Sequence, residues 1–323
     1  MGRYLIRRSL FLILVLFIIS ILTFLIFVKL PPGDPARRFA GRRATAEQIE
    51  QVRHQLGLDD SVFTQYGRLA KGLIPWPGFF LNEDVYFSFV NFVPVKEEIY
   101  GRLPVSITLA LGGAVVWLLI GLPVGIISAI RPRSFFDRAG MLFALFGVSA
   151  PVFWLGFLFL YVFWFKLQVA PGSGIPPDES LVQAVFSGRF ILPWVAISLS
   201  FAAFYARMSR GNLIETMGED YIRTARAKGL SERRVILRHG LRAALTPVVT
   251  MFGMDMGILL GGAVITETVF NLPGIGQYAI RSLLTNDIPA VMGVTILAAF
   301  FIVAANLIVD IVYAFLDPRV RYT

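Results

Sequence analysis

The feature that most limits how this chain can fold is a series of six long stretches with almost no charged residue. Asp255 is the one charge within them, and the six stretches are residues 9–28, 103–130, 139–165, 190–206, 243–266 and 288–309. A helix of about 20 apolar residues crosses the hydrocarbon core of a bilayer. Helix is the expected form because its backbone hydrogen bonds are satisfied internally. The sequence therefore predicts an all-α integral membrane protein with six transmembrane helices.

Basic residues are distributed unevenly between the segments that join these stretches. If the N-terminus is cytoplasmic, more than half of the 30 lysines and arginines lie on the cytoplasmic side, in residues 1–8, 131–138, 207–242 and 317–323. The short loops on the other side, residues 166–189 and 271–287, carry only Lys166, Arg189 and Arg281. This asymmetry follows the positive-inside rule and predicts that both termini are cytoplasmic.

The segment that follows the first stretch is predicted to be large and extracytoplasmic. Its basic and acidic residues balance, and loops of more than about 60 residues are translocated largely regardless of charge. Within it, Thr45 and Gln48 predict a capping box at the start of a helix over residues 46–56, and Gly57 predicts its end. The first stretch itself is expected to be a retained anchor, because its uncharged run exceeds the roughly 7 to 15 residues of a signal sequence.

These boundaries divide the chain into four parts. They are a first transmembrane helix, an extracytoplasmic segment, a membrane core of five helices that contains a cytoplasmic loop at 210–242, and a cytoplasmic tail: residues 1–30, 31–102, 103–317 and 318–323.

Several kinds of chemistry are disfavoured. Cysteine is absent, so disulfides, thiolate nucleophiles and cysteine metal sites are excluded. His54 and His239 are isolated from each other and form no cluster of the kind that binds zinc. No Gly-x-x-x-x-Gly-Lys-Ser/Thr motif occurs, and the chain therefore has no phosphate-binding loop of that kind. We expect no catalytic residue, no metal and no cofactor of its own.

A basic segment separates the fourth and fifth stretches. Asp220 is predicted to cap a helix that ends at Gly229, and Ser231 is predicted to cap a second helix directly after it. Ala225, Leu230 and the apolar residues at 235–237 are expected on one side, with the arginines pointing outward.

Three readings of this helix–turn–helix segment compete. A DNA-binding unit has similar spacing and charge, but a unit between membrane spans lacks a supporting third helix. A solvated basic loop explains neither the ordered caps nor the apolar residues, which would have nothing to pack against. A docking element for a cytoplasmic protein explains both features and is the favoured interpretation.

Several motifs, in order along nearly the whole chain, resemble the transmembrane subunits of ABC importers in the dipeptide, oligopeptide and nickel permease branch. They are Pro32-Gly33-Asp34-Pro35, Arg102-Leu103-Pro104, Thr224 to Leu230, Glu267 to Gly276, Asn306 to Asp310 and Asp317-Pro318-Arg319. The resemblance implies a type I ABC importer permease fold and a bacterial or archaeal inner-membrane location.

By this resemblance, the segment after the fourth span corresponds to the "EAA" coupling loop, whose short helix fits a groove on an ATPase subunit. Ala225 and Gly229 match that loop, while Arg223 and Thr224 replace its glutamate and first alanine. The implied coupling residues are Tyr221, Arg223, Thr224, Ala225, Arg226, Lys228, Gly229 and Leu230.

The resemblance also implies partners and a substrate class. The expected partners are a second homologous permease, two ATPase subunits that bind ATP and magnesium, and an extracytoplasmic substrate-binding protein. The substrate is expected to be a dipeptide or oligopeptide, although nickel chelates and some sugars also occur in this branch.

Asp255 is the residue singled out within the membrane. A carboxylate in mid-span costs about 2.5–3.5 kcal/mol on insertion scales, so it should face protein or water. One interpretation places Asp255, Gly261 and Gly262 on the translocation path. The other makes Asp255 a structural partner of a neighbouring helix or subunit.

The main alternative function is an ion-coupled secondary transporter, because intramembrane acids can relay protons. That class is expected to show inverted repeats with broken helices near the midplane, a pattern not evident in this sequence. A membrane-embedded enzyme is weaker still, because the spans offer no catalytic constellation.

Overall fold

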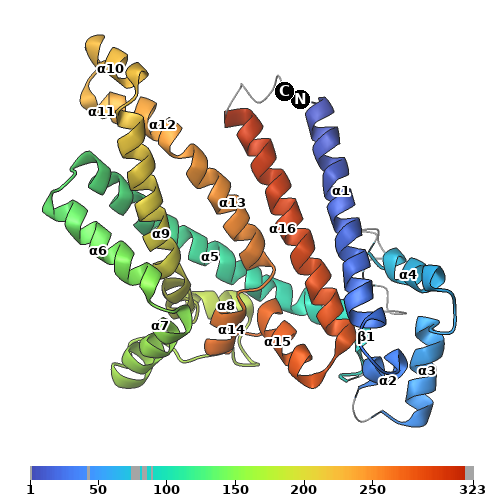
Figure 1. Ribbon diagram of the computed structural model, residues 1–323. Helices are drawn as coiled ribbons and strands as arrows, with labels where there is room; N and C mark the ends of the chain where they lie inside the picture. Colours follow the sequence, from blue (N-terminus) through green and yellow to red (C-terminus); the bar gives the residue numbers. More distant parts are fainter. Residues whose placement is uncertain (1, 42–43, 74–80, 82–85, 89, 317–323) are drawn as a thin grey trace. The chain divides into compact units, whose positions relative to one another are not determined.

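The structure is a computed structural model that describes residues 2–41, 44–73, 81, 86–88 and 90–316. These residues are mostly helical (Figure 1). Strands β1 (Phe87–Ser88) and β2 (Val93–Pro94) form a short antiparallel pair, with Phe87 opposite Pro94. The fold is therefore built almost entirely from helices, as the sequence predicts.

Four continuous helical stretches in the described part of the chain are long and apolar enough to cross a membrane. The first is α1 (Gly2–Phe24), which continues as the π-helical segment η1 (Leu25–Lys29). The others are α5 (Val95–Ile130), α9 (Ile191–Met217) and α16 (Ile288–Leu316). They contain the first, second and sixth predicted stretches and nearly all of the fourth, and they extend past the uncharged runs.

The third predicted span is not one straight helix. Helix α6 (Phe135–Ser149) is followed by α7 (Val152–Phe159) and the π-helical segment η2 (Leu160–Lys166), with a bend of 100° between the two halves. Pro151 lies at the bend, directly before α7. Proline has no N–H and its ring collides with the preceding helical turn, so the prediction of a single helix over residues 139–165 was wrong.

The fifth predicted span ends earlier than expected. Helix α13 (Thr246–Leu260) stops before Gly262, which adopts a φ of +121°, and a separate short helix α14 (Val264–Val269) follows. A bend of 46° separates α13 from the helical stretch before it. The predicted continuation to residue 266 was wrong because the chain turns at Gly262, in a conformation that only glycine adopts readily.

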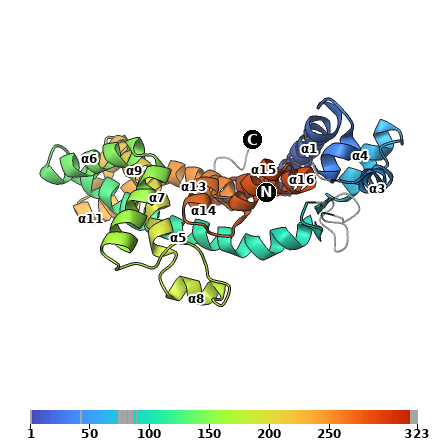
Figure 2. The same ribbon diagram turned by 90° about the horizontal axis from the view of Figure 1, so that it is seen from below.

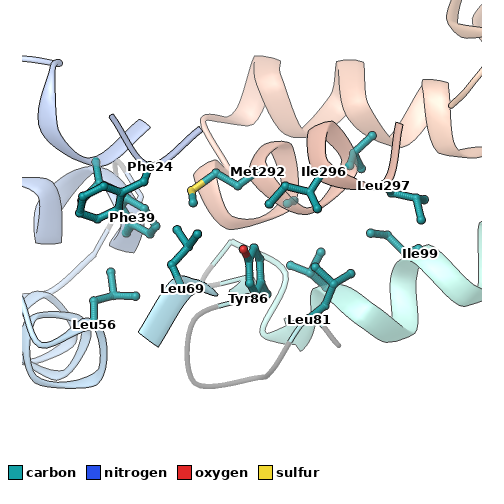
Figure 3. Close-up of a cluster of buried hydrophobic side chains, with 14 of the residues drawn as sticks. Phe24, Phe39, Leu56, Leu69, Leu81, Tyr86, Ile99, Met292, Ile296 and Leu297 are labelled. Carbon is teal, nitrogen blue, oxygen red and sulfur yellow. The ribbon is translucent and has the colours of Figure 1, made fainter. Parts of the chain in front are cut away.

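The described chain forms two compact units. The first comprises Met1–Ile107, Gly257–Thr268 and Leu272–Leu307. Besides α1, its own helices are α2 (Pro35–Ala40), α3 (Ala46–Leu56), α4 (Val62–Lys71) and α15 (Ile275–Thr285). Figure 3 shows Phe24, Phe39 and Leu69 gathered near the side chain of Met292, within a larger buried apolar cluster. The residues after the first span thus fold onto the membrane helices of the same unit.

Local sequence signals in this unit are confirmed. The Thr45 side chain accepts a hydrogen bond from the Gln48 backbone N–H, and the Gln48 side chain accepts one from the Thr45 N–H, which completes the predicted capping box. Gly57 ends α3 in the left-handed conformation. Arg38 donates to the carbonyl oxygens of Phe27 and Val28. It thereby satisfies acceptors that the end of the first span would leave unpaired.

The second unit comprises Thr108–Met256, Val269–Asn271 and Ile308–Thr323. Helix α6 lies along α9 in both Figure 1 and Figure 2. Glycines let α5 approach α9 closely: a Cβ at Gly121 would lie 2.7 Å from the Ala202 carbonyl oxygen, and one at Gly125 would lie 2.4 Å from that of Ala206. Small residues at these positions permit the close helix packing that is common in membranes. A short helix, α8 (Leu181–Phe186), carries its own capping box from Ser180 and Gln183.

Candidate functional site

The basic segment after α9 forms a small self-supporting module. Helix α10 (Asp220–Ala227) is followed by α11 (Glu232–Arg234), the π-helical segment η3 (Val235–Gly240) and α12 (Leu241–Ala244). Ile222, Ala225 and Val235 are buried together, and Met217 and Leu230 pack against them. For Ala225, Leu230 and Val235 the expectation of a partner was therefore wrong, because they belong to a core of the module itself, whereas Leu237, predicted on the same side, is 52% exposed. A partner can contact only what this core leaves outside.

The turn between α10 and α11 has a local cause. Gly229 adopts a φ of +76°, and the Leu230 N–H donates to the Ala225 carbonyl oxygen at 3.4 Å. This pattern is a Schellman ending, in which a left-handed glycine closes a helix and the next apolar residue packs back on the last turn. The predicted stop at Gly229 is confirmed, and Leu230 is fixed in place by the small core.

The predicted caps are only partly correct. Glu219, not Asp220, occupies the N-cap position of α10, and Asp220 is the first helical residue. There the Asp220 carboxylate is favoured by the positive end of the helix dipole and pairs with Arg223 at 3.3 Å. Ser231 does occupy the N-cap position of α11, but its side chain makes no capping hydrogen bond there.

The outward side of the module is polar and basic. Arg223 and Thr224 are exposed on α10, Lys228 is exposed directly after it, and Tyr221 on the same helix is 45% exposed. The Thr224 hydroxyl donates to the Asp220 carbonyl oxygen at 3.0 Å. Successive helical residues are separated by about 100°, so Arg223 and Thr224 lie on the side away from Ile222 and Ala225, and Lys228 follows as the C-cap residue of the helix. The structure thus leaves Arg223, Thr224 and Lys228 accessible, outside the small core of the module.

Arg226 has a different position from the other basic residues of α10. Its guanidinium donates to both carboxylate oxygens of Glu232, at 3.1 Å and 2.6 Å. This paired geometry joins α10 to α11 across the turn. Both side chains are substantially exposed, so the pair contributes little to stability. We assign to Arg226 a role in holding the two helices in register.

Asp255 is hydrogen-bonded within its own unit. The Tyr205 hydroxyl on α9 donates to its carboxylate on α13 at 2.6 Å. Asp255 is half-buried, whereas Tyr205 is fully buried. This bond to a neighbouring helix is the arrangement that the structural interpretation of Asp255 expects, and a role in the path stays a prediction.

Gly261 and Gly262 lie where backbones come close together. A Cβ at Gly261 would be 2.9 Å from that of Ala298 on α16, and one at Gly262 would be 2.6 Å from the backbone nitrogen of Gly276. Both contacts lie within the first unit. Glycine is therefore required at both positions by the close packing of neighbouring segments. The assignment of Gly261 and Gly262 to the translocation path stays a prediction.

A buried carboxylate organises the segment around α14 and α15. Glu267 has no exposed surface. One of its oxygens accepts from the Ser106 hydroxyl at 2.8 Å and from the Ala263 N–H at 3.2 Å, and the other accepts from the Gln277 N–H at 2.8 Å. Burial raises the pKa of Glu267 above the usual glutamate value, and these donors oppose that shift. Ser106 also accepts from the Ile275 N–H at 2.8 Å.

An ion pair between Asp137 and Arg210 joins helices α6 and α9 of the second unit. The Arg210 guanidinium on α9 donates to both oxygens of Asp137 in the first turn of α6, at 2.6 Å and 2.9 Å. The backbone N–H of Arg133 also donates to Asp137. The Asp137 side chain is only 7% exposed and that of Arg210 is 27% exposed. This pair fixes α6 to α9, the helix that leads into the module.

Sequence reasoning missed Tyr205, Ser106 and the pairing of Asp137 with Arg210. Ser134 three residues before Asp137 is a helix-start signal, and Ser134 does cap α6. The partners of these side chains lie 50 or more positions away in the chain. No local pattern identifies partners at such separations.

Two family models match this sequence. The model described as "Binding-protein-dependent transport system inner membrane component" matches residues 121–322. The model for the N-terminal part of such membrane components matches residues 1–110. The two matches together take in nearly the whole chain, including the module and the segment around Glu267.

Curated relatives and solved structures agree with these matches. The glutathione transport system permease proteins GsiC of Escherichia coli strain K12 and of Shigella dysenteriae serotype 1 are each 39% identical over 322 residues, covering 100% of both chains. A chain from an inward facing MetNI methionine ABC transporter superposes with a TM-score of 0.55 at 18% identity, covering 69% of this chain and 97% of the other. A second crystal form gives a TM-score of 0.52. At this identity the structural likeness shows the fold alone.

Proposed function

Because the chain belongs to the family of inner membrane components of binding-protein-dependent transport systems, we propose that it forms half of the path by which an ATP-driven importer moves short peptides. It is a multi-pass membrane permease subunit, and the described residues contain four continuous helices and two bent helix pairs of sufficient length to span a membrane. The observation that carries the coupling role is the outward basic face of α10, defined by Arg223, Thr224 and Lys228 and supported by its own small core.

The module has the properties needed to transmit force. Its first helix follows α9 directly, and its second leads into α13, so both ends join membrane-spanning helices. The buried Ile222 and Val235 pack α10 against η3, and the exposed Arg226–Glu232 pair connects α10 to α11. A partner that moves the face of α10 would therefore move the ends of α9 and α13 with it, as in rigid-body gating.

We assign ATP hydrolysis to separate subunits. Two ATPases bind ATP and magnesium on the cytoplasmic side, and their grooves receive α10 of this chain and the equivalent helix of a second, homologous permease. A substrate-binding protein delivers substrate on the other side. The two bent pairs count as one span each in this arrangement, which gives six spans, cytoplasmic termini and an extracytoplasmic segment over residues 31–102. The predicted tail after residue 317 lies outside the described residues.

The substrate class is inferred from the relatives. The relatives at 39% identity are described as glutathione transport permeases, and glutathione is itself a short peptide. A substrate of this size and polarity fits delivery by a binding protein. Asp255, Gly261 and Gly262 keep their predicted place along the path in this proposal.

Reversing the charge of the outward face tests the coupling role. The double variant Arg223→Glu/Lys228→Glu is expected to reduce the ATPase recovered with the purified chain by about tenfold or more. In a groove that receives a basic surface, the new glutamates would face like charges, which costs several kcal/mol. About 1.4 kcal/mol already corresponds to a factor of ten in affinity. The amount of ATPase and its substrate-stimulated ATP hydrolysis are measured after gentle solubilisation.

The matched control is Arg37→Glu/Lys71→Glu, which reverses two exposed basic residues of the segment placed on the opposite side of the membrane. It is expected to leave the recovery of ATPase unchanged. Equal recovery from the two double variants would contradict the docking role of α10.

A further inference from the structure

Helix α4 lies beside the membrane-spanning part of α1, although it belongs to the segment after the span. The Tyr66 hydroxyl and the Ser20 hydroxyl are 2.7 Å apart and share a hydrogen bond. The Tyr66 ring also meets Phe17 and Phe24 edge to face, with centroids 6.1 Å and 5.7 Å apart. Tyr66 is thus fixed against the second half of α1.

The depth of this contact follows from the length of the helix. Lys29 is the last residue of the first apolar span, and its ammonium group lies over the Phe24 ring, 5.9 Å from the ring centroid. Ser20 precedes Lys29 by nine residues, which corresponds to a depth on the order of 10 Å along a helix. The hydrocarbon core is about 30 Å thick, so Tyr66 meets α1 within one leaflet.

The two flanks of α4 differ in chemistry. Gln65 and Leu69 are buried and define its inner side. At about 100° per residue, Phe63, Gly67 and Ala70 form one flank next to Tyr66. Thr64, Arg68 and Lys71 form the other flank, on which Arg68 pairs with Asp60. An apolar flank that adjoins a basic one is the pattern of a helix that lies in a membrane interface.

The apolar flank is open. Phe63 is 90% exposed, and no atom lies within 4 Å of the place that a Cβ of Gly67 would occupy. Phe17, which touches Tyr66 from α1, is itself 51% exposed. The apolar surface therefore continues from the lipid-facing side of α1 across Tyr66 to Phe63.

We propose that α4 is embedded in the leaflet at the Lys29 end of α1, with Phe63 and Gly67 in contact with lipid acyl chains and Arg68 and Lys71 at the headgroups. The occupant of this flank is the bilayer itself, because the flank continues a lipid-facing surface and sits at acyl-chain depth. The segment between the first two spans is then anchored to the membrane through α4.

The chain contains no cysteine, so single cysteines can carry a spin label without further changes. Phe63→Cys is compared with Lys71→Cys on the opposite flank of α4 and with Ile13→Cys, which replaces a residue that is 63% exposed on α1. The full chain is reconstituted with its accompanying subunits in vesicles of phosphatidylethanolamine and phosphatidylglycerol. Collision rates with oxygen and with a water-soluble nickel chelate are measured at each label.

The labels at Phe63→Cys and Ile13→Cys are expected to collide often with oxygen and several-fold less often with the nickel chelate than the label at Lys71→Cys. Nickel collisions at Phe63→Cys equal to those at Lys71→Cys would place this flank in water. Low collision rates with both reagents would show that a protein covers it. Either result would overturn the proposal.

Discussion

Glu267→Gln is expected to destabilise the first unit by about 3 kcal/mol or more. Each oxygen of the buried carboxylate accepts from a backbone N–H, which can only donate: Ala263 on one oxygen and Gln277 on the other. An amide replaces one oxygen by a donor, whichever way it is turned. Buried donors left without an acceptor cost about 1–3 kcal/mol each. The midpoint of thermal unfolding, followed by fluorescence-detected size exclusion of the purified chain, measures the loss.

Two further variants serve as comparisons for the loss of stability in Glu267→Gln. Ser106→Ala removes the hydroxyl between Glu267 and the Ile275 N–H, and it should lower the midpoint by less than Glu267→Gln does. Glu97→Gln makes the same chemical change at an exposed position and should have almost no effect. If Glu267→Gln unfolds at the same temperature as Glu97→Gln, the carboxylate does not organise this segment.

Breaking the pair between α6 and α9 is the second large effect expected. Asp137→Ala leaves Arg210, with only 27% of its side chain exposed, without the carboxylate that it contacts. Removing one partner of a buried ion pair costs about 3–5 kcal/mol, and the residual exposure of Arg210 favours the lower end. The variant should therefore unfold at a clearly lower temperature, and less folded protein should be recovered from membranes.

A double substitution distinguishes the cost of leaving one charge unpaired from the contribution of the ion pair itself. Asp137→Leu/Arg210→Met replaces both charges by apolar groups, which is often close to neutral for a buried pair, and should recover most of the stability that Asp137→Ala loses. Arg207→Ala changes an exposed arginine on the same helix and serves as the control. A double variant that is no more stable than Asp137→Ala would refute the account of this pair.

What the sequence predicted well depends on neighbours along the chain. The capping box of Thr45 and Gln48 and the left-handed Gly57 involve residues within one or two turns. The apolar runs predicted helices of spanning length for the same reason, because hydropathy is a property of contiguous residues. Hydropathy does not record direction, however, and the run through Pro151 concealed a bend of 100°.

What the sequence could not supply depends on distant segments. The Glu267 site brings together Ser106, Ala263 and Gln277, and Tyr205 reaches Asp255 across 50 positions. The sequence also did not show that Ile222 on α10 and Val235 on η3 are buried together in the small core of the module. Their apolar character is therefore explained within the module, and the exposed residues of α10 are the ones available to a partner.

The central claim is that the outward face of α10 docks on an ATPase subunit, and crosslinking from Thr224 tests it most directly. In this cysteine-free chain, Thr224→Cys places one thiol on that face, and Glu97→Cys places one at the exposed start of α5. A photoactivated maleimide crosslinker is attached, the native membranes are illuminated, and the products are identified by mass spectrometry. The account predicts a product between Thr224→Cys and an ATP-hydrolysing subunit and none from Glu97→Cys. If Thr224→Cys forms no crosslinked product with an ATPase while the transporter remains active, the claim that α10 docks on an ATPase subunit is contradicted.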